Sequence, residues 1–411
     1  METAASGPNY DIVVAGAGYV GLATAVAIRD AAPDLSILLV DAAPEGVWRR
    51  DARASALAAA AVRMMRQLGT WDAMEGEAQP ITEMIVTDSR TSDPVRPVFL
   101  TFGGEAEPGE PFAHMVPNTG LNGALRERAE ALGVEIRAGA PVTGIDERPA
   151  AIRIELGDGS TVDARLLVAA DGVRSKIRDM AGIRTIHKAY GQSGIVATVA
   201  HERPHGGRAE EHFLPAGPFA VLPLKGNRSS LVWTEPTAEA NRLIGADEMV
   251  FEMELEQRFG LRLGPIRVEG ERRAFPLGLT LARDFVRPRV ALVGDAAHGI
   301  HPIAGQGLNL GFKDAAALAE TVVDAARLGC DIGSIDTLER YQRWRRFDTV
   351  QMGIVTDVLN RLFSNDSAVL RQVRSFGLSL VDRAPFAKRY FIGQAAGLGG
   401  PSPRLLQGEP I

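Results

Sequence analysis

The sequence predicts an α/β protein, α+β over the whole chain, with a parallel-sheet domain assembled from separated segments. Three short apolar runs, at residues 10–15, 166–170 and 289–293, are candidates for buried parallel strands, and each ends at a Gly-rich or Asp-Gly motif. Strand-like segments with Gly and Pro between them separate the second run from the third. This arrangement indicates a second, β-rich domain inserted into the first.

The composition is that of a globular protein with modest charge. Of 411 residues 45% are apolar, and 45 Lys and Arg against 51 Asp and Glu leave a net charge of −6. Such a chain argues against broad nucleic-acid binding, which needs a basic surface. The single cysteine, Cys330, excludes an intramolecular disulfide and a thiolate metal cluster. We see no signal peptide and no membrane-spanning run, and therefore expect a cytoplasmic protein.

The first 40 residues predict a strand, a Gly-rich turn, a helix and a second strand. The strand covers residues 10–15, the helix ends near residue 31, and the second strand covers residues 36–40. The turn between strand and helix reads Gly16-Ala17-Gly18-Tyr19-Val20-Gly21. This Gly-x-Gly-x-x-Gly pattern, between a strand and a helix, is typical of a Rossmann-like dinucleotide-binding unit.

Each glycine of this pattern has its own expected role. Gly16 permits the tight turn, Gly18 lets a pyrophosphate approach the backbone, and Gly21 lets helix and strand pack closely. The N-terminus of the helix supplies free N–H groups and a positive dipole end. Asp41, 20 residues after Gly21, is placed to accept hydrogen bonds from a ribose. The alternative is a Gly-rich turn without a ligand.

Further helices and strands are expected along the rest of the chain. The expected helices cover residues 52–68, 118–132 with Asn118 as the cap, 238–259, and most of the chain after Gly305. The expected strands lie within residues 134–170, with a hairpin turn at 157–159, and within 195–234, 266–281 and 289–293.

A second motif, Asp171-Gly172, follows the buried strand at residues 166–170. Asp171 can fix the turn by accepting hydrogen bonds from backbone N–H groups, and Gly172 leaves room for a nucleotide. Because a strand followed by Asp-Gly is common, a turn without a ligand is an equal alternative.

The third motif carries the most information. A buried strand delivers Asp295 to its carboxyl end, where ligands bind in open α/β sheets, and an acid there can bind the hydroxyls of a flavin's ribityl chain. A Gly-rich loop after Pro302 then opens a long helix whose N–H groups would stabilise the negative charge of a reduced flavin. His298 and His301 lack the partners of a metal site, so we predict no metal.

The three motifs, in this order and spacing, resemble those of the aromatic hydroxylases with one FAD, the p-hydroxybenzoate hydroxylase-like flavoprotein monooxygenases. The resemblance implies a Rossmann-like FAD-binding domain built from discontinuous segments, a β-sheet substrate domain and C-terminal helices. We assign residues 1–80, 111–182 and 281–340 to the FAD-binding domain, 81–110 and 183–280 to the substrate domain, and 341–411 to the C-terminal helical segment.

The same resemblance gives roles to individual residues. The residues that it places in contact with FAD are Gly16, Gly18, Gly21, Asp41, Arg53, Asn118, Asp295, Gly307 and Leu308. Asp171 would shape the region of the nicotinamide and the pyrophosphate, and Pro302 would lie beside the flavin ring where substrate docks. Pro302 is the candidate nearest the chemistry, and no catalytic acid or base is assigned. For Arg53 the alternative is a solvated helix arginine, and for Asn118 it is a plain helix N-cap.

The C-terminal part narrows the resemblance. Residues 374–385, Lys388 and 395–397, together with 301–320, look like the matching parts of the ubiquinone-biosynthesis hydroxylases. The implied activity is hydroxylation of the ring of a polyprenylated phenol or quinone precursor, with FAD, NAD(P)H and O2. Two alternatives stay open. One is a hydroxylase of a small aromatic or natural-product substrate, and the other is a non-catalytic flavin-bound scaffold of a biosynthetic complex.

An apolar stripe with helical spacing bears on partners and location. Its members are Ile354, Val355, Val358, Leu359, Leu362 and Phe363. The stripe either packs against the protein itself or meets a membrane, a partner or a prenyl tail. Peripheral contact with the inner face of the membrane, contact within a biosynthetic complex and a homo-oligomer therefore remain open.

Overall fold

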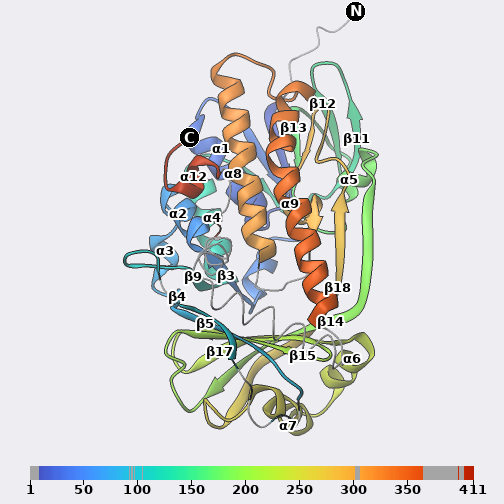
Figure 1. The fold of residues 1–411 in the computed structure, drawn as a ribbon. Coiled ribbons are helices and arrows are strands. Elements are labelled where there is room, and N and C mark those ends of the chain that lie inside the picture. Colours follow the sequence, from blue (N-terminus) through green and yellow to red (C-terminus); the bar gives the residue numbers. More distant parts are fainter. Residues whose placement is uncertain are drawn as a thin grey trace, which may run out of the picture.

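The structure is a computed structural model that describes residues 9–300, except 92, 94, 95, 97 and 104, together with 306–363, 397 and 402–411. Pro302 lies outside the described residues, as do most of the C-terminal segments that carry the family resemblance. The described part contains two large sheets, each with eight strands, which lie one above the other in Figure 1. Mixed sheets and helices of this kind confirm the predicted fold class.

The first sheet contains the predicted βαβ unit. Its parallel strands are β10 (Glu135–Arg137), β2 (Ile37–Val40), β1 (Tyr10–Ala15), β13 (Thr161–Ala169) and β20 (Val290–Leu292). Antiparallel strands β12 (Ile152–Leu156), β11 (Val142–Glu147) and β19 (Val286–Arg287) complete it. The carboxyl ends of β1, β2, β13 and β20 therefore bring the motifs after residues 15, 40, 169 and 292 to one edge of the sheet.

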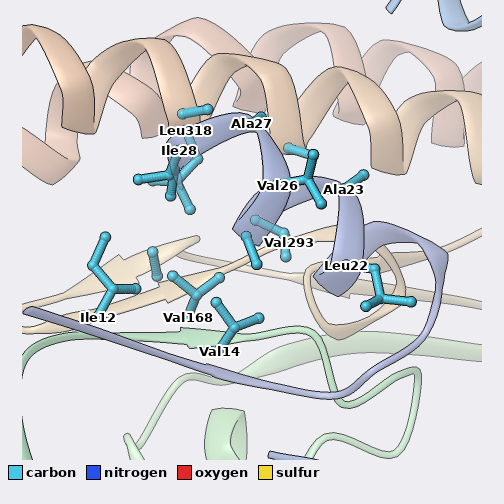
Figure 2. Packing of buried hydrophobic residues seen from close by; sticks show 14 of the residues in the cluster. Ile12, Val14, Leu22, Ala23, Val26, Ala27, Ile28, Val168, Val293 and Leu318 are labelled. Atoms are coloured by element: carbon cyan, nitrogen blue, oxygen red, sulfur yellow. The ribbon is translucent and has the colours of Figure 1, made fainter. Parts of the chain in front are cut away.

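The core of this part is a three-layer arrangement. Figure 2 shows helix α1 (Tyr19–Ala31) between the strands that carry Val14 and Val168 and the long helix α8 (Gln306–Arg327), which carries Leu318. The residues of α1 from 21 to 28 are buried, because the helix is covered on one side by the sheet and on the other by α8. The small side chains Ala23 and Ala27 allow this close packing.

The second sheet forms the lower part of the molecule in Figure 1. Its strands, in spatial order, are β21 (His298–Gly299), β18 (Ile266–Ala282), β14 (Thr185–His201), β17 (Arg228–Pro236), β16 (Gly217–Leu224), β15 (Arg208–Leu214), β5 (Glu83–Asp88) and β6 (Val98–Gly103). Helices α6 (Thr237–Gly245) and α7 (Glu248–Phe259) pack on one face through a core that includes Trp233 and Phe251.

The domain boundaries given in the sequence analysis remain a prediction.

Two expected helices are corrected by the structure. Within residues 52–68, strand β3 (Ala54–Ala58) pairs with β9 (Ala113–Pro117), which also pairs with β4 (Gln79–Ile81), and helix α2 begins only at Ala59 and ends at Gln67. Ala-rich residues favour a helix locally, but pairing with β9 decides the conformation here. Residues 238–259 form two helices, because Asp247 caps α7 by accepting a hydrogen bond from the Val250 N–H.

The remaining elements of the described residues are short, apart from two helices. They are η1 (Val47–Arg50), α3 (Asp72–Glu75), β7 (Glu105–Glu107), β8 (Glu110–Pro111), α4 (Asn118–Ala131), α5 (Lys176–Met180), η2 (Gly294–Ala296), α9 (Ile335–Phe363) and α12 (Arg404–Gln407). The expected helix at 118–132 is thus found, and the helical stretch expected after residue 305 is found as α8 and α9 with a break between them, while residues 364–396 lie outside the described residues.

The apolar stripe lies on α9. Ile354, Val355 and Val358 are 59%, 42% and 52% exposed, so much of each of these apolar residues remains uncovered. The other three side chains of the stripe lie outside the described residues. Among the helices described, none is long and apolar enough to cross a membrane.

Candidate active site

A cavity of about 520 Å³ lies between the carboxyl edge of the first sheet and one face of the second. On one side it is lined by residues of the three predicted motifs, among them Gly18, Asp295 and Gly307. On the other side it is lined by residues of β15, β16 and β17, such as Ala220 and Val232. The fold therefore joins the candidate cofactor region and the second sheet in a single cavity.

The Gly-rich turn shows two kinds of constraint. A Cβ atom on Gly16, which has φ of +112°, would lie 2.3 Å from the Ala170 carbonyl oxygen, and one on Gly21 would lie 1.9 Å from the Gly16 oxygen. These two glycines are required by the protein's own packing. A Cβ on Gly18 would meet no atom of the described residues within 4 Å, and Gly18 lines the cavity. The protein itself therefore leaves space at Gly18 for a ligand.

Asp41 follows β2 and supports the turn. Its two carboxylate oxygens accept hydrogen bonds from the Ala17 N–H at 2.6 Å and the Ala43 N–H at 2.7 Å. A carboxylate has about four acceptor positions, so these two bonds leave capacity for a ribose hydroxyl. Asp41 thus lies beside the turn as predicted, and its contact with FAD remains a prediction.

Asp171 fixes the turn after β13, as its sequence position predicts. One carboxylate oxygen accepts hydrogen bonds from the Lys176 N–H at 2.9 Å and the Ile177 N–H at 3.3 Å, at the start of α5. Gly172 has φ of +83°, in the left-handed region that favours glycine, and lines the cavity. The carboxylate is therefore used to hold the turn, while its neighbour Gly172 faces the cavity.

Arg53 and Asn118 belong to a polar cluster centred on Asp51. The Arg53 guanidinium donates to both oxygens of Asp51, at 2.7 and 2.8 Å, and the Asn118 amide donates to it at 3.0 Å. The Tyr19 hydroxyl also donates to Asp51, at 2.6 Å, and Ser55 donates to Asn118. Arg53, Asn118, Tyr19 and Ser55 all line the cavity.

This cluster decides two alternatives left open by the sequence. Arg53 precedes strand β3, so the helix in that alternative is wrong, while the side chain is paired with Asp51 and remains 46% exposed. Asn118 begins α4 but makes no capping hydrogen bond, because its side chain is used by Asp51 and Ser55, so the N-cap alternative is also wrong. Asp51 itself was not predicted, since an acid two residues before an arginine has no distinctive sequence signal.

The charge state of the cluster follows from its contacts. Burial opposes ionisation of Asp51, but hydrogen bonds from Arg53, Tyr19 and Asn118 outweigh it and hold the pKa of Asp51 below its usual range. Burial and the hydrogen bond to Asp51 raise the pKa of the Tyr19 hydroxyl. The cluster therefore presents a guanidinium and a neutral phenol at the cavity wall, and the Asp51 carboxylate holds both from behind.

Asp295 reaches the cavity from η2, directly after β20. Its side chain is open to the cavity but surrounded by protein, and this partial desolvation raises the pKa of its carboxyl, against the charges of His298 and Arg53. Gly307 and Leu308 line the same cavity from the first turn of α8. The first N–H groups of a helix have no partner within it, so this end of α8 can donate to a ligand.

The residues present fit an FAD molecule. The space at Gly18, the first turn of α8 at Gly307 and Leu308, and the carboxyl of Asp295 facing the cavity match a pyrophosphate, an electron-rich ring and a polyhydroxylated chain respectively. Within the described ranges, no group of three potential metal ligands is found.

A buried network beneath this edge was not predicted. Asp314 of α8, His298 and Arg345 of α9 have no solvent exposure. Asp314 accepts hydrogen bonds from His298, from the Arg345 Nε at 2.8 Å and from the Gly294 N–H at 3.0 Å. Asp314 is a charged residue on the apolar face of a predicted helix, and this feature of the sequence could have predicted the network.

The class of protein follows from the family comparison. Residues 9–346 match the model of the FAD binding domain family. The chain therefore belongs to this family of FAD-dependent aromatic-ring monooxygenases, in which FAD is the cofactor and NAD(P)H the reductant. The predictions of an enzyme and of both cofactors are confirmed, and the alternative of a non-catalytic scaffold is not supported.

Within this class, the chain belongs to the ubiquinone-biosynthesis hydroxylases. It is 43% identical over 408 residues to ubiquinone hydroxylase UbiL of Rhodospirillum rubrum, which covers 98% of this chain and 93% of the relative. It is 34% identical to 3-demethoxyubiquinol 3-hydroxylase of Escherichia coli, over 94% of this chain and 98% of the relative. It is 32% identical to the mitochondrial ubiquinone biosynthesis monooxygenase COQ6 of Homo sapiens, over 90% of this chain and 88% of the relative.

Solved structures agree on the fold. The p-nitrophenol 4-monooxygenase PnpA of Pseudomonas putida superposes with a TM-score of 0.78 at 20% identity, covering 96% of this chain and 99% of that one. HpxO of Klebsiella pneumoniae, solved with FAD, gives 0.75 at 19% identity, covering 95% and 99%. At such identities the likeness concerns the fold alone.

Proposed function

We propose that this protein hydroxylates the ring of a polyprenylated phenol or quinone precursor in ubiquinone biosynthesis, using NAD(P)H and O2. The observation that carries the proposal is the near full-length identity of 43% to a ubiquinone hydroxylase. The cavity supports this function, because the predicted cofactor residues line one side of it and an apolar sheet face suited to an aromatic ring lines the other.

The chain's own residues would hold the cofactor as follows. Gly18 and the start of α1 would accept the pyrophosphate, Asp41 the ribose, and Asp295 the ribityl hydroxyls. Gly307 and Leu308 would donate N–H groups to the flavin ring. Bound FAD supplies the activation of O2, and the protein orients the substrate and excludes water.

Arg53 and Asn118 would contact the cofactor from the Asp51 cluster. Because Asp51 already holds both side chains by hydrogen bonds, little conformational freedom is lost when they meet a ligand. Asp171 would act indirectly, by holding the turn that carries Gly172. We retain Pro302 as the residue proposed to lie beside the flavin ring.

The sheet side of the cavity suits an aromatic ring. Its apolar wall is formed by Ile81 of β4 and by residues from four strands of the second sheet, namely Met84, Ala209, Ala220, Leu222 and Val232. These side chains offer dispersion contacts over the ring faces and no competing hydrogen bonds. A ring that enters here lies between this wall and the residues proposed to hold the flavin.

The exposed stripe on α9 supports contact with a membrane surface, where a polyprenylated substrate would reside. Ile354, Val355 and Val358 form three adjacent exposed apolar side chains, and a net charge of −6 provides no general attraction to anionic lipid. Contact would then depend on apolar side chains. A cytoplasmic location, contact within a biosynthetic complex and a homo-oligomer are part of the same proposal.

The experiment compares two substrates on the purified holoenzyme. A phenol with a prenyl tail should stimulate NAD(P)H oxidation, and yield hydroxylated product, at far lower concentration than the same phenol without its tail. Burial of a tail is worth about 0.8 kcal/mol per methylene-sized group, so a few isoprene units dominate affinity. Equal stimulation by both phenols in the same detergent would contradict the proposal and favour a small aromatic substrate.

A further inference from the structure

Glu211 places a carboxyl group in the wall of the cavity. It was not among the site residues predicted from the sequence. It lies on β15, is 4% exposed, and lines the cavity. Side chains alternate between faces along a strand. Its neighbours Glu210 and His212 therefore point to the opposite face, where Glu210 pairs with Arg262 at 2.6 Å and with His212 at 3.1 Å.

No partner for this carboxyl is found within the part of the chain that the structure describes. Glu210, one residue away, makes several ion pairs, whereas Glu211 makes no hydrogen bond and no ion pair there. Buried carboxyl groups in proteins are almost always paired, because an unpaired one loses its hydration without compensation. An orphaned carboxyl that faces a cavity is therefore a candidate for binding a ligand.

The strand register places Glu211 on an otherwise apolar wall. Glu211 lies opposite Val86 of β5 and Ala220 of β16, and Ala220 lies opposite Val232 of β17. Of the described residues that this sheet contributes to the cavity, only Glu211 is ionisable, and the Thr234 hydroxyl is the other polar group. An aromatic ring held by this wall would thus meet one carboxyl.

We propose that Glu211 is a catalytic residue that accepts a hydrogen bond from the ring hydroxyl of the substrate and takes up its proton. The inference rests on the proposed function, since only a substrate with such a hydroxyl offers the donor. Glu211 would thus add a base to a cavity wall that otherwise recognises only the apolar shape of the substrate.

The step balances as follows. The substrate O–H bond breaks, its proton goes to the Glu211 carboxylate, and the electron pair left on oxygen raises the electron density at the ring carbons ortho and para to it. One oxygen atom of O2 is added at such a carbon, and two electrons from NAD(P)H reduce the other atom to water. The hydrogen of that carbon then leaves as a proton, which enters the water formed, and Glu211 returns its own proton to the ring oxygen.

Protonation of Glu211 would switch this step off at low pH. Burial raises the pKa of Glu211 to about 7, so the carboxylate is available only toward neutral and higher pH. The other ionisable side chains that line the cavity are Tyr19, Arg53 and Asp295, on its cofactor side. On the adjoining strands, β16 carries none facing the cavity and the charged ends of β5, Glu83 and Asp88, do not line it.

The test compares Glu211→Gln with wild type and with Glu83→Gln. The control makes the same change on the neighbouring strand, at a half-exposed carboxyl outside the cavity. The probes are 2-prenylphenol and its O-methyl ether, which lacks the O–H donor, and binding is followed by the flavin spectrum of the holoenzyme.

We expect wild type and Glu83→Gln to prefer the phenol by about tenfold or more, as for a hydrogen bond to a charged group. Their hydroxylation rate should rise with pH through about 7. Glu211→Gln should keep its flavin, lose most of the preference, show a flat pH profile and divert reducing equivalents to hydrogen peroxide. Glu211→Asp should keep part of the preference for the phenol and part of the pH dependence. If Glu211→Gln does not fold, the role of Glu211 is tested with Glu211→Asp alone.

An unchanged preference and an unchanged pH profile in both Glu211 variants would overturn the assignment. The result is separable from the proposed function. If wild type prefers the phenol and Glu211→Gln loses this preference, but no hydroxylated product forms, the proposed function and the catalytic role fail while Glu211 stands as the residue that binds the hydroxyl.

Discussion

His298 Nε2 is hydrogen-bonded to a carboxylate oxygen of Asp314, and neither side chain has any solvent exposure. The same Asp314 oxygen accepts from the backbone N–H of Gly294, one residue before Asp295. The second oxygen accepts from Arg345 of α9. Asp314 therefore connects the loop that carries Asp295 to two helices, and the charges of His298 and Arg345 hold its pKa low despite burial.

Arg345→Leu should be strongly destabilising. Removal of one partner leaves Asp314 buried without its compensating charge, and breaking a buried pair in this way costs about 3–5 kcal/mol. The free energy of unfolding, measured by urea denaturation, should fall accordingly. Arg343→Leu is the control on the same helix, because the Arg343 side chain is largely exposed and its ion pair with Glu339 is long, at 3.9 Å. Equal stability of the two variants would contradict a structural role for the network.

Gly18→Val and Gly21→Val should fail in different ways. At Gly18 the described residues leave open space, so the valine variant should fold but lose FAD, because its side chain occupies the path of the pyrophosphate. At Gly21 the added Cβ would meet the Gly16 carbonyl oxygen at 1.9 Å, so that variant should not fold normally. Flavin absorbance and circular dichroism separate the two outcomes. A folded Gly18→Val protein with full flavin content would refute the assignment of the turn.

Asp295→Ala should weaken FAD binding while the fold persists. A hydrogen bond to a charged group contributes about 1.5–3 kcal/mol, which corresponds to about ten- to a hundredfold in affinity. The side chain faces the cavity, and the helices and strands around it are held by Asp314 rather than by Asp295. Flavin release on dilution measures the change. Release at the wild-type rate would mean that Asp295 has only a structural role.

Asp51→Asn should make stability less sensitive to acid. The pKa of Asp51 lies below its ordinary value of 3.8, so the stabilisation from its ion pair with Arg53 is present above that value and is lost as the pH falls below it. Between pH 5 and pH 3, the melting temperature of wild type should therefore fall more than that of the variant. Glu45→Gln, at an exposed carboxyl with only long ion pairs, should behave as wild type. Parallel curves for wild type and Asp51→Asn would contradict the assigned charge state.

Local sequence patterns determined the framework of the molecule. Strands β1 and β2 and the end of helix α1 were predicted within one residue of their observed bounds, whereas the helix begins at Tyr19, inside the pattern assigned to the turn. Apolar runs, glycine spacing and Asp-Gly turns act over a few residues, so they can be read directly from the chain. For the same reason the positions of Asp171 and Asp295 at strand ends were predictable.

Only the tertiary structure decided what these elements meet. Residues 54–58 form a strand rather than part of a helix because β9 pairs with it and Asn309, 251 residues away from Ala58, accepts a hydrogen bond from its N–H. Asn118 contacts Asp51 across 67 residues instead of capping its own helix. Glu211 faces the cavity because the register of β15 and β16 assigns it to that face of the sheet. Such pairings depend on long-range contacts that bury polar groups together, and no local pattern in the chain specifies which distant partner a side chain finds.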